Sequence, residues 1–68
     1  MNTVFKGLDT SNRIRGILAS RGMTQAELAK ILSLTPETIS ARMKNNKWDV
    51  EELKSIAKHF NVEMNDLV

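Results

Sequence analysis

The side chains of this sequence that are charged at neutral pH, ten Lys and Arg and eight Asp and Glu, are unevenly distributed. Residues 1–47 carry eight Lys and Arg against three Asp and Glu, whereas residues 48–68 carry two against five. The two parts have formal charges of +5 and −3, which together give the net charge of +2. A polyanion is therefore attracted to the first two-thirds of the chain and repelled by the last third.

The sequence has few side chains that are suited to catalysis or metal binding. The chain has no Cys and one His, His59, which excludes disulfides, thiolate zinc sites and paired-His metal sites. No Ser–His–acid set and no glycine-rich phosphate loop is recognisable. We therefore expect no enzyme and no cofactor, with His59 as an exposed surface residue.

The chain length and hydropathy indicate one small domain in a cytoplasmic setting. The 68 residues allow a single domain, and a domain of this size buries only about 60% of its unfolded surface, which leaves little stability to spare. No stretch approaches the ~18 apolar residues of a membrane span. The N-terminus has no apolar run of signal-peptide length.

Apolar residues recur at helical spacing along the whole chain, and no run has the alternation that is typical of strands. We expect an all-α fold that is a compact five-helix bundle. Residues 1–8 either add a turn or lie as an ordered arm. The five helices are expected at about 9–21, 24–32, 35–45, 49–61 and 63–68.

Local signals mark the ends of the second and third helices. Thr24 and Glu27 have the spacing of a capping box. Thr35 is a good N-cap ahead of Pro36 at the first helical position. The third helix closes at 45–46, two Asn residues, which tolerate the left-handed conformation.

The third helix is apolar along one edge only, formed by Ile39 and Met43. A helix buried on all sides would be more hydrophobic. Two short capped helices joined by the tight turn Ser33–Leu34, the second with a largely polar surface, are typical of a helix-turn-helix. In that motif the second helix enters the major groove of DNA.

Residues 14–68 resemble the Cro and phage-repressor (CI-type) family, in its phage or prophage subset. The resemblance implies a lambda-repressor-like DNA-binding domain over residues 1–68, with residues 35–45 as the recognition helix. It rests on four stretches in the order and spacing of the family: MTQAELA at 23–29, LTPETIS at 34–40, LKSIAK at 53–58 and NVEMNDL at 61–67.

Several residues depart from the family pattern. Ser33 stands where the turn usually has Gly, which costs about 1 kcal/mol if its φ is positive. Asn45 takes the place of a second Gly, after the recognition helix. Arg42 stands where relatives have an apolar residue, and Met43 is expected to supply the packing. Trp48 is expected to anchor the loop before the fourth helix.

The resemblance also implies which side chains face DNA. Glu37 can accept from cytosine N4, and Thr38 and Ala41 can contact thymine methyl groups, but none of the expected base-reading residues makes a bidentate pair with a purine. The base-reading residues are Pro36, Glu37, Thr38 and Ala41, and the phosphate-binding residues are Gln25, Thr35, Ser40, Arg42, Lys44, Asn46 and Lys47.

These features predict a sequence-specific transcriptional regulator of the phage repressor or Cro type, bound to an operator in double-stranded DNA. A small domain reads few base pairs, so we expect a homodimer that associates weakly without DNA. Its subunit contact would involve Phe60, Met64, Leu67 and Val68, for which closure of the core is the alternative.

A second interpretation gives the same fold to a protein-interaction module, such as an antirepressor or an antitoxin-like partner. The weak base-reading chemistry of Pro36, Glu37 and Ala41 is the feature in its favour. RNA binding is disfavoured because aromatic residues make up 4% of the chain, too few for stacking on bases.

Overall fold

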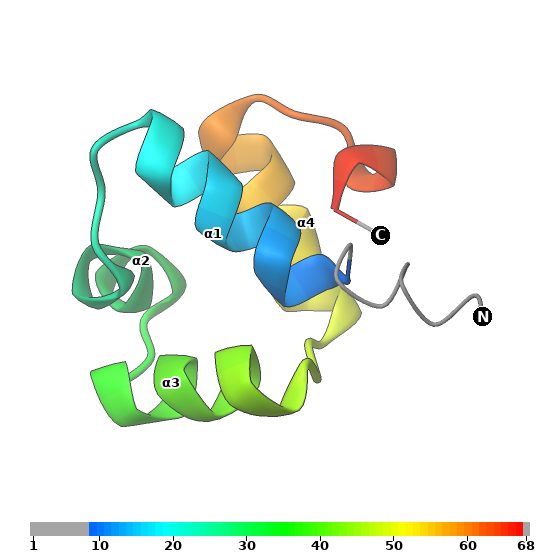
Figure 1. The fold of residues 1–68 in the computed structure, drawn as a ribbon. Coiled ribbons are helices and arrows are strands. Elements are labelled where there is room, and N and C mark those ends of the chain that lie inside the picture. The colour runs from blue at the N-terminus through cyan, green and yellow to red at the C-terminus, as the bar shows by residue number, and fades with distance from the viewer. Residues whose placement is uncertain (1–8, 68) are drawn as a thin grey trace, which may run out of the picture.

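Four α-helices and one short 3₁₀ turn follow one another in the computed structural model, which describes residues 9–67 (Figure 1). In the view of Figure 1, α1 passes in front of α4, α2 lies to their left, and α3 runs below. No strand is present between residues 9 and 67, as the sequence predicted. The elements are α1 (Thr10–Ser20), α2 (Gln25–Leu32), α3 (Pro36–Asn45), α4 (Val50–Phe60) and η2 (Met64–Asp66).

The prediction of five α-helices is wrong in its count. The last segment forms only the three-residue 3₁₀ turn Met64–Asp66. Helix nucleation is unfavourable in so short a segment, and 3₁₀ geometry is the usual form of such pieces. The suggested arm or extra turn at residues 1–8 falls outside the described residues, as does Val68.

The predicted caps of α2 and α3 are confirmed. The Thr24 hydroxyl accepts from the Glu27 amide at 3.1 Å, and the Glu27 carboxylate accepts from the Thr24 amide at 2.8 Å, which completes the capping box. The Thr35 hydroxyl accepts from the Thr38 amide at 3.2 Å ahead of Pro36. Each cap satisfies amides that have no partner within the helix.

Residues with positive φ end α2, α3 and α4. Ser33 has a φ of 59°, Asn46 of 53° and Asn61 of 57°. Ser33 therefore carries the strain that Gly would avoid, of about 1 kcal/mol. At the end of α3 the left-handed residue is Asn46 and not Asn45, which is still helical. This corrects the expectation that Asn45 takes the place of the family's Gly.

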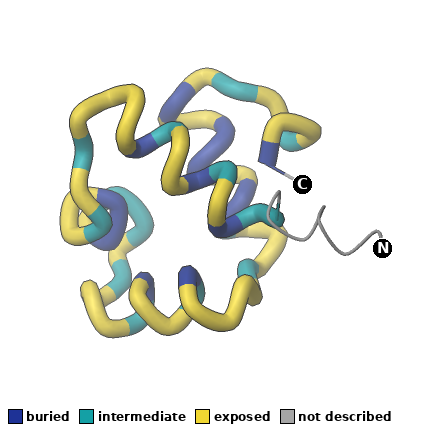
Figure 2. Tube along the Cα trace, in the orientation of Figure 1, coloured by how far each residue is buried: buried dark blue, intermediate teal, exposed yellow. Residues whose placement is uncertain are grey.

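The buried core draws on every helix (Figure 2). Leu32 and Leu34 are partly buried and pack against it. Phe60 and Leu67 are 2% and 0% exposed, so they close the core of one chain and offer no surface for a subunit contact. The core consists of Ile14, Leu18, Leu28, Ala29, Ile39, Met43, Leu53, Ile56, Ala57, Phe60 and Leu67.

Ile39→Ala should unfold or nearly unfold the domain. Ile39 is completely buried, and truncation of a buried Ile costs about 2–5 kcal/mol, which is close to the whole stability of a domain this small. Thermal melting measures the effect, with Ser40→Ala at the exposed neighbouring position as the control. A mutant that melts with the wild type would contradict the placement of Ile39.

Candidate nucleic-acid interface

The turn between α2 and α3 is held by backbone hydrogen bonds. The Leu34 amide donates to the Ala29 carbonyl at 2.8 Å, and the Ser33 amide donates to the Lys30 carbonyl at 3.2 Å. These are the paired bonds of a Schellman motif, and they fix the direction in which the chain leaves α2. Ala29 is 1% exposed, and its small side chain allows the helices to cross closely. The result is a helix-turn-helix unit.

α3 keeps one edge in the core and leaves the opposite side in solvent. Ile39 and Met43 are 0% and 4% exposed, whereas Glu37, Ala41 and Lys44 are exposed. Figure 2 shows this helix at the periphery, with its few buried positions turned toward the other elements. Met43 supplies the packing expected of it beside the polar Arg42.

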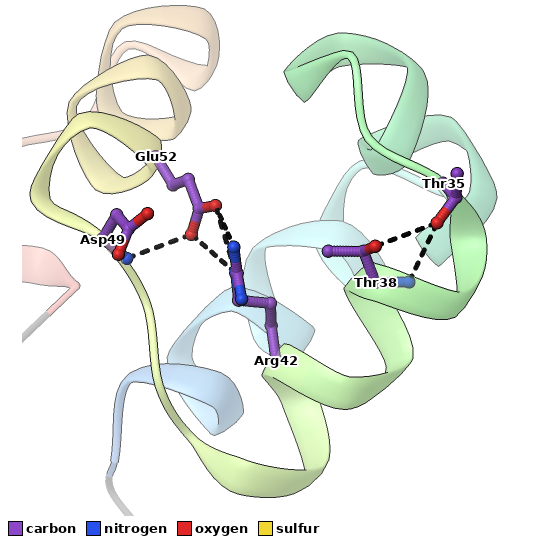
Figure 3. A network of polar contacts seen from close by, with 5 residues as sticks. All are labelled: Thr35, Thr38, Arg42, Asp49 and Glu52. Carbon is purple, nitrogen blue, oxygen red and sulfur yellow. Dashed lines mark hydrogen bonds and ion pairs between the residues drawn. The ribbon is translucent and has the colours of Figure 1, made fainter.

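The four expected base-reading residues lie in the first two turns of α3. Pro36, Glu37 and Ala41 are exposed, and Thr38 is half-buried. The hydroxyl oxygens of Thr35 and Thr38 are 2.9 Å apart and hydrogen-bonded (Figure 3). The Thr38 hydroxyl is therefore already engaged within the chain.

Arg42, expected at a phosphate, has a partner inside the molecule. Its Nε donates to one carboxylate oxygen of Glu52 at 2.9 Å and its Nη2 to the other at 2.7 Å (Figure 3). The same carboxylate accepts from the Asp49 amide at 3.0 Å. Arg42 is therefore a link between α3 and the first turn of α4. Sequence reasoning missed Glu52 as its partner, because no local spacing rule joins positions on two different helices.

The ion pair changes the pKa of both groups. At Glu52 the largest influence is partial burial, which raises the pKa because it disfavours the charged form. Hydrogen bonds from Arg42 and from the Asp49 amide, together with the charge of Arg42, outweigh burial and leave the pKa of Glu52 lowered. The pKa of Arg42 is raised, chiefly by its hydrogen bond to Glu52 and against desolvation. Both groups are charged at neutral pH.

Asn46, also expected at a phosphate, is bound to the start of α1. Its Oδ1 accepts from the Ser11 amide at 2.9 Å and from the Ser11 hydroxyl at 3.0 Å. The Trp48 Nε1 donates to that hydroxyl at 3.0 Å, which confirms Trp48 as a loop anchor. Ser11 is 1% exposed and joins α1 to the end of α3. Its role was missed, because a Ser in a first helical turn is usually exposed.

The other residues predicted to contact DNA or a second subunit take no part in the contacts of Arg42 and Asn46. Gln25 is half-buried at the first position of α2, and Met64, from the expected subunit contact, is half-buried in η2. His59 is exposed, as predicted. Thr35, Ser40, Lys44 and Lys47 are exposed on or beside α3.

Comparison with known families agrees with this geometry. Residues 13–68 match the model of the Cro/C1-type HTH DNA-binding domain. The chain belongs to this family. No curated protein sequence and no solved structure matches the chain.

Membership of the Cro/C1-type family makes residues 13–68 an HTH DNA-binding domain, in which α2 and α3 form the helix-turn-helix. Domains of this family are typically not enzymes. Within residues 9–67, no helix is long and apolar enough to cross a membrane.

Ser11→Ala should destabilise the Cro/C1-type domain by about 1–3 kcal/mol, because the half-buried Trp48 indole N–H loses its acceptor and the Asn46 side-chain oxygen loses one of its two donors. Trp48, the single tryptophan, should report the change through its fluorescence. Chemical unfolding followed at Trp48 measures the loss. Ser20→Ala on the exposed end of α1 is the control, and equal stability of the two variants would contradict the role of Ser11.

Glu52→Gln should melt a few degrees below the wild type at neutral pH. The folded-state pKa of Glu52 is lowered, so the ion pair stabilises the fold fully above the ordinary Glu pKa of about 4.3. This stabilisation is lost as the pH falls through the lowered pKa. The difference between the two proteins should therefore shrink in acid.

Melting curves from neutral to acidic pH test this dependence. Glu51→Gln is the matched control, since the Glu51 carboxylate is exposed and lies 3.9 Å from the Lys54 ammonium. An exposed pair of this kind contributes little. A constant difference between wild type and Glu52→Gln at every pH would contradict the ion pair as its cause.

Proposed function

We propose that this chain is a sequence-specific transcriptional regulator that binds an operator in double-stranded DNA with α3 in the major groove. The observation that carries the proposal is the two-sided character of α3. Ile39 and Met43 fix one edge in the core, and the opposite side is exposed over the length of the helix. The Cro/C1-type family supports the same assignment.

In this proposal the side chains around α3 divide into three roles. Glu37 and Ala41 contact base edges, together with Pro36 and Thr38. Arg42 and Asn46 position the helix through α4 and α1, and no longer count among the phosphate ligands. The phosphate ligands are Gln25, Thr35, Ser40, Lys44 and Lys47.

We further propose a homodimer of the phage repressor or Cro type, acting in the cytoplasm. Two copies on a two-fold symmetric site would have half-site centres about 34 Å apart or a multiple of that distance. With Phe60 and Leu67 in the core, half-buried Met64 is what remains of the expected contact within residues 9–67. Such a contact is small, so the dimer should form mainly on DNA.

A salt titration of binding to random duplex DNA tests the proposed function. A DNA-binding domain loses affinity steeply as salt rises, because phosphate contacts release counterions. A protein-interaction module shows little duplex binding at any salt, and this result would favour the alternative. Site selection from random DNA then tests the dimer, since a selected site without two-fold symmetry would contradict it.

Lys47→Ala and Glu37→Gln should change DNA binding in different ways. A phosphate contact carries no sequence information, so loss of Lys47 should weaken all duplexes alike and lower the salt slope by about one. Glu37→Gln removes a charge that repels phosphate and adds a donor suited to adenine. It should raise non-specific affinity and shift the preference at one position by about 1–3 kcal/mol.

Site selection and salt titration of both variants measure these effects. Lys58→Ala is the control, because Lys58 is exposed in the last turn of α4, on the part of the molecule remote from α3 (Figure 1). Selection of the wild-type site by Glu37→Gln would show that Glu37 reads no base. Unchanged duplex affinity as well would place α3 outside the groove.

A further inference from the structure

The two Asn residues at the end of α3 have different tasks. Asn46 takes the left-handed conformation, with φ of 53°, and its side-chain oxygen is held by the amide and hydroxyl of Ser11 at 2.9 and 3.0 Å. Asn45 is the last residue of α3, remains helical and is exposed. Closure of the helix therefore uses Asn46 alone and leaves the Asn45 amide group in solvent.

Asn45 continues the exposed ridge of α3. Glu37, Ala41 and Asn45 follow one another at intervals of four residues, so they share one face of the helix. All three are exposed, on the side opposite the buried Ile39 and Met43. The ridge extends over eight residues, about 12 Å at the rise of an α-helix, which is comparable with the width of the major groove.

The chemistry of the ridge singles out its C-terminal end. Glu37 can only accept hydrogen bonds and Ala41 can make only apolar contacts. The Asn45 side chain has a donor and an acceptor in one plane, and this is the pattern that pairs with N7 and N6 of adenine. It is the one member of the ridge that is able to make a bidentate contact with a purine.

Charge favours the same end. The Glu37 carboxylate at the start of α3 repels the DNA backbone, whereas the cations that flank Asn45, Lys44 and Lys47, are exposed. The exposed lysines therefore favour a close approach of the C-terminal end of α3 to the backbone.

The C-terminal end of α3 is also held in place. Asn46 is bound to Ser11, and Trp48 donates to the same hydroxyl at 3.0 Å. One turn before Asn45, Arg42 makes its bidentate contact with Glu52. A base contact needs a side chain carried on such a braced element, because positional freedom weakens selectivity.

We propose that Asn45 is a specificity-determining residue that pairs with an adenine in the major groove, at the C-terminal end of α3. The inference rests on the proposed function and deepens it. In HTH domains the first residues of the recognition helix usually contact the bases. Here the first turn contains Pro36 and Glu37, and the last residue of the helix supplies the missing purine contact.

The test combines a protein variant with a base variant. Site selection from random duplex DNA identifies the adenine that the wild type prefers and Asn45→Ala no longer prefers. That adenine is then replaced by 7-deazaadenine, which keeps the base pair and removes the N7 acceptor. The wild type should lose about 5- to 100-fold in affinity on this replacement. Asn45→Ala should bind both duplexes with equal affinity.

Asn65→Ala is the matched control, an exposed Asn in η2 away from α3, and it should retain the wild-type selectivity. Asn45→Ala should keep the fold, because Ala has the higher helix propensity, and a melting curve checks this. Asn45→Gln lengthens the same amide group and should shift or weaken the preference without changing the salt slope.

Two results overturn the assignment of Asn45 while DNA binding stands. One is selection of the same site by Asn45→Ala and wild type, and the other is an equal loss of affinity by Asn45→Ala on every duplex, which would mark a phosphate contact. If the wild type binds no duplex or prefers no site, the proposed function itself fails and this assignment falls with it.

Discussion

The orientation of α3 depends on the buried hydroxyl of Ser11. That group lies between the Asn46 side chain and the Trp48 indole, at 3.0 Å from each, and the Ser11 amide adds a third bond to Asn46. Burial of a polar group without partners is unfavourable, so all members of the network must be in place together. The start of α1, the end of α3 and the loop before α4 are therefore fixed by one set of contacts.

This constraint matters because α3 has little apolar surface with which to pack against the core. Two side chains, Ile39 and Met43, enter the core, and no other residue of the helix is buried. Hydrophobic burial alone would leave the helix free to roll about its narrow apolar edge. Arg42 and Glu52 prevent this on one side, and the Ser11 network prevents it at the C-terminal end. The orientation of α3, and with it the direction of its exposed face, is therefore fixed by polar contacts beside its apolar edge and at its C-terminal end.

The polar contacts also separate the charged residues that have a partner inside the protein from those that remain exposed. Arg42 lies in the cationic segment 1–47, yet it forms an ion pair with Glu52 of the acidic segment 48–68. Lys44, in the last turn of α3, and Lys47, just after it, stay exposed. The formal charge of a segment therefore overstates what it offers to a polyanion, since a charge with a partner inside the protein contributes little to the outer field.

Features that arise within one or two helical turns follow from the amino-acid sequence alone. The caps at Thr24 and Thr35, the left-handed residue Ser33 and the apolar stripes that became the core all follow from interactions between residues a few positions apart. The resemblance of residues 14–68 to the Cro and phage-repressor family was visible in the same way. The short final segment was overestimated, because its apolar residues have helical spacing but too few neighbours to propagate a helix.

Which polar side chains are bound inside the protein and which stay in solvent depends on how the helices pack. Ser11 meets Asn46 across 35 positions, and Arg42 meets Glu52 across ten. Such pairs depend on the crossing angle and rotation of whole helices, which no local pattern specifies. The separation of Asn45 from Asn46 is of the same kind, because one residue of helix phase decides which amide turns toward α1 and which stays in solvent.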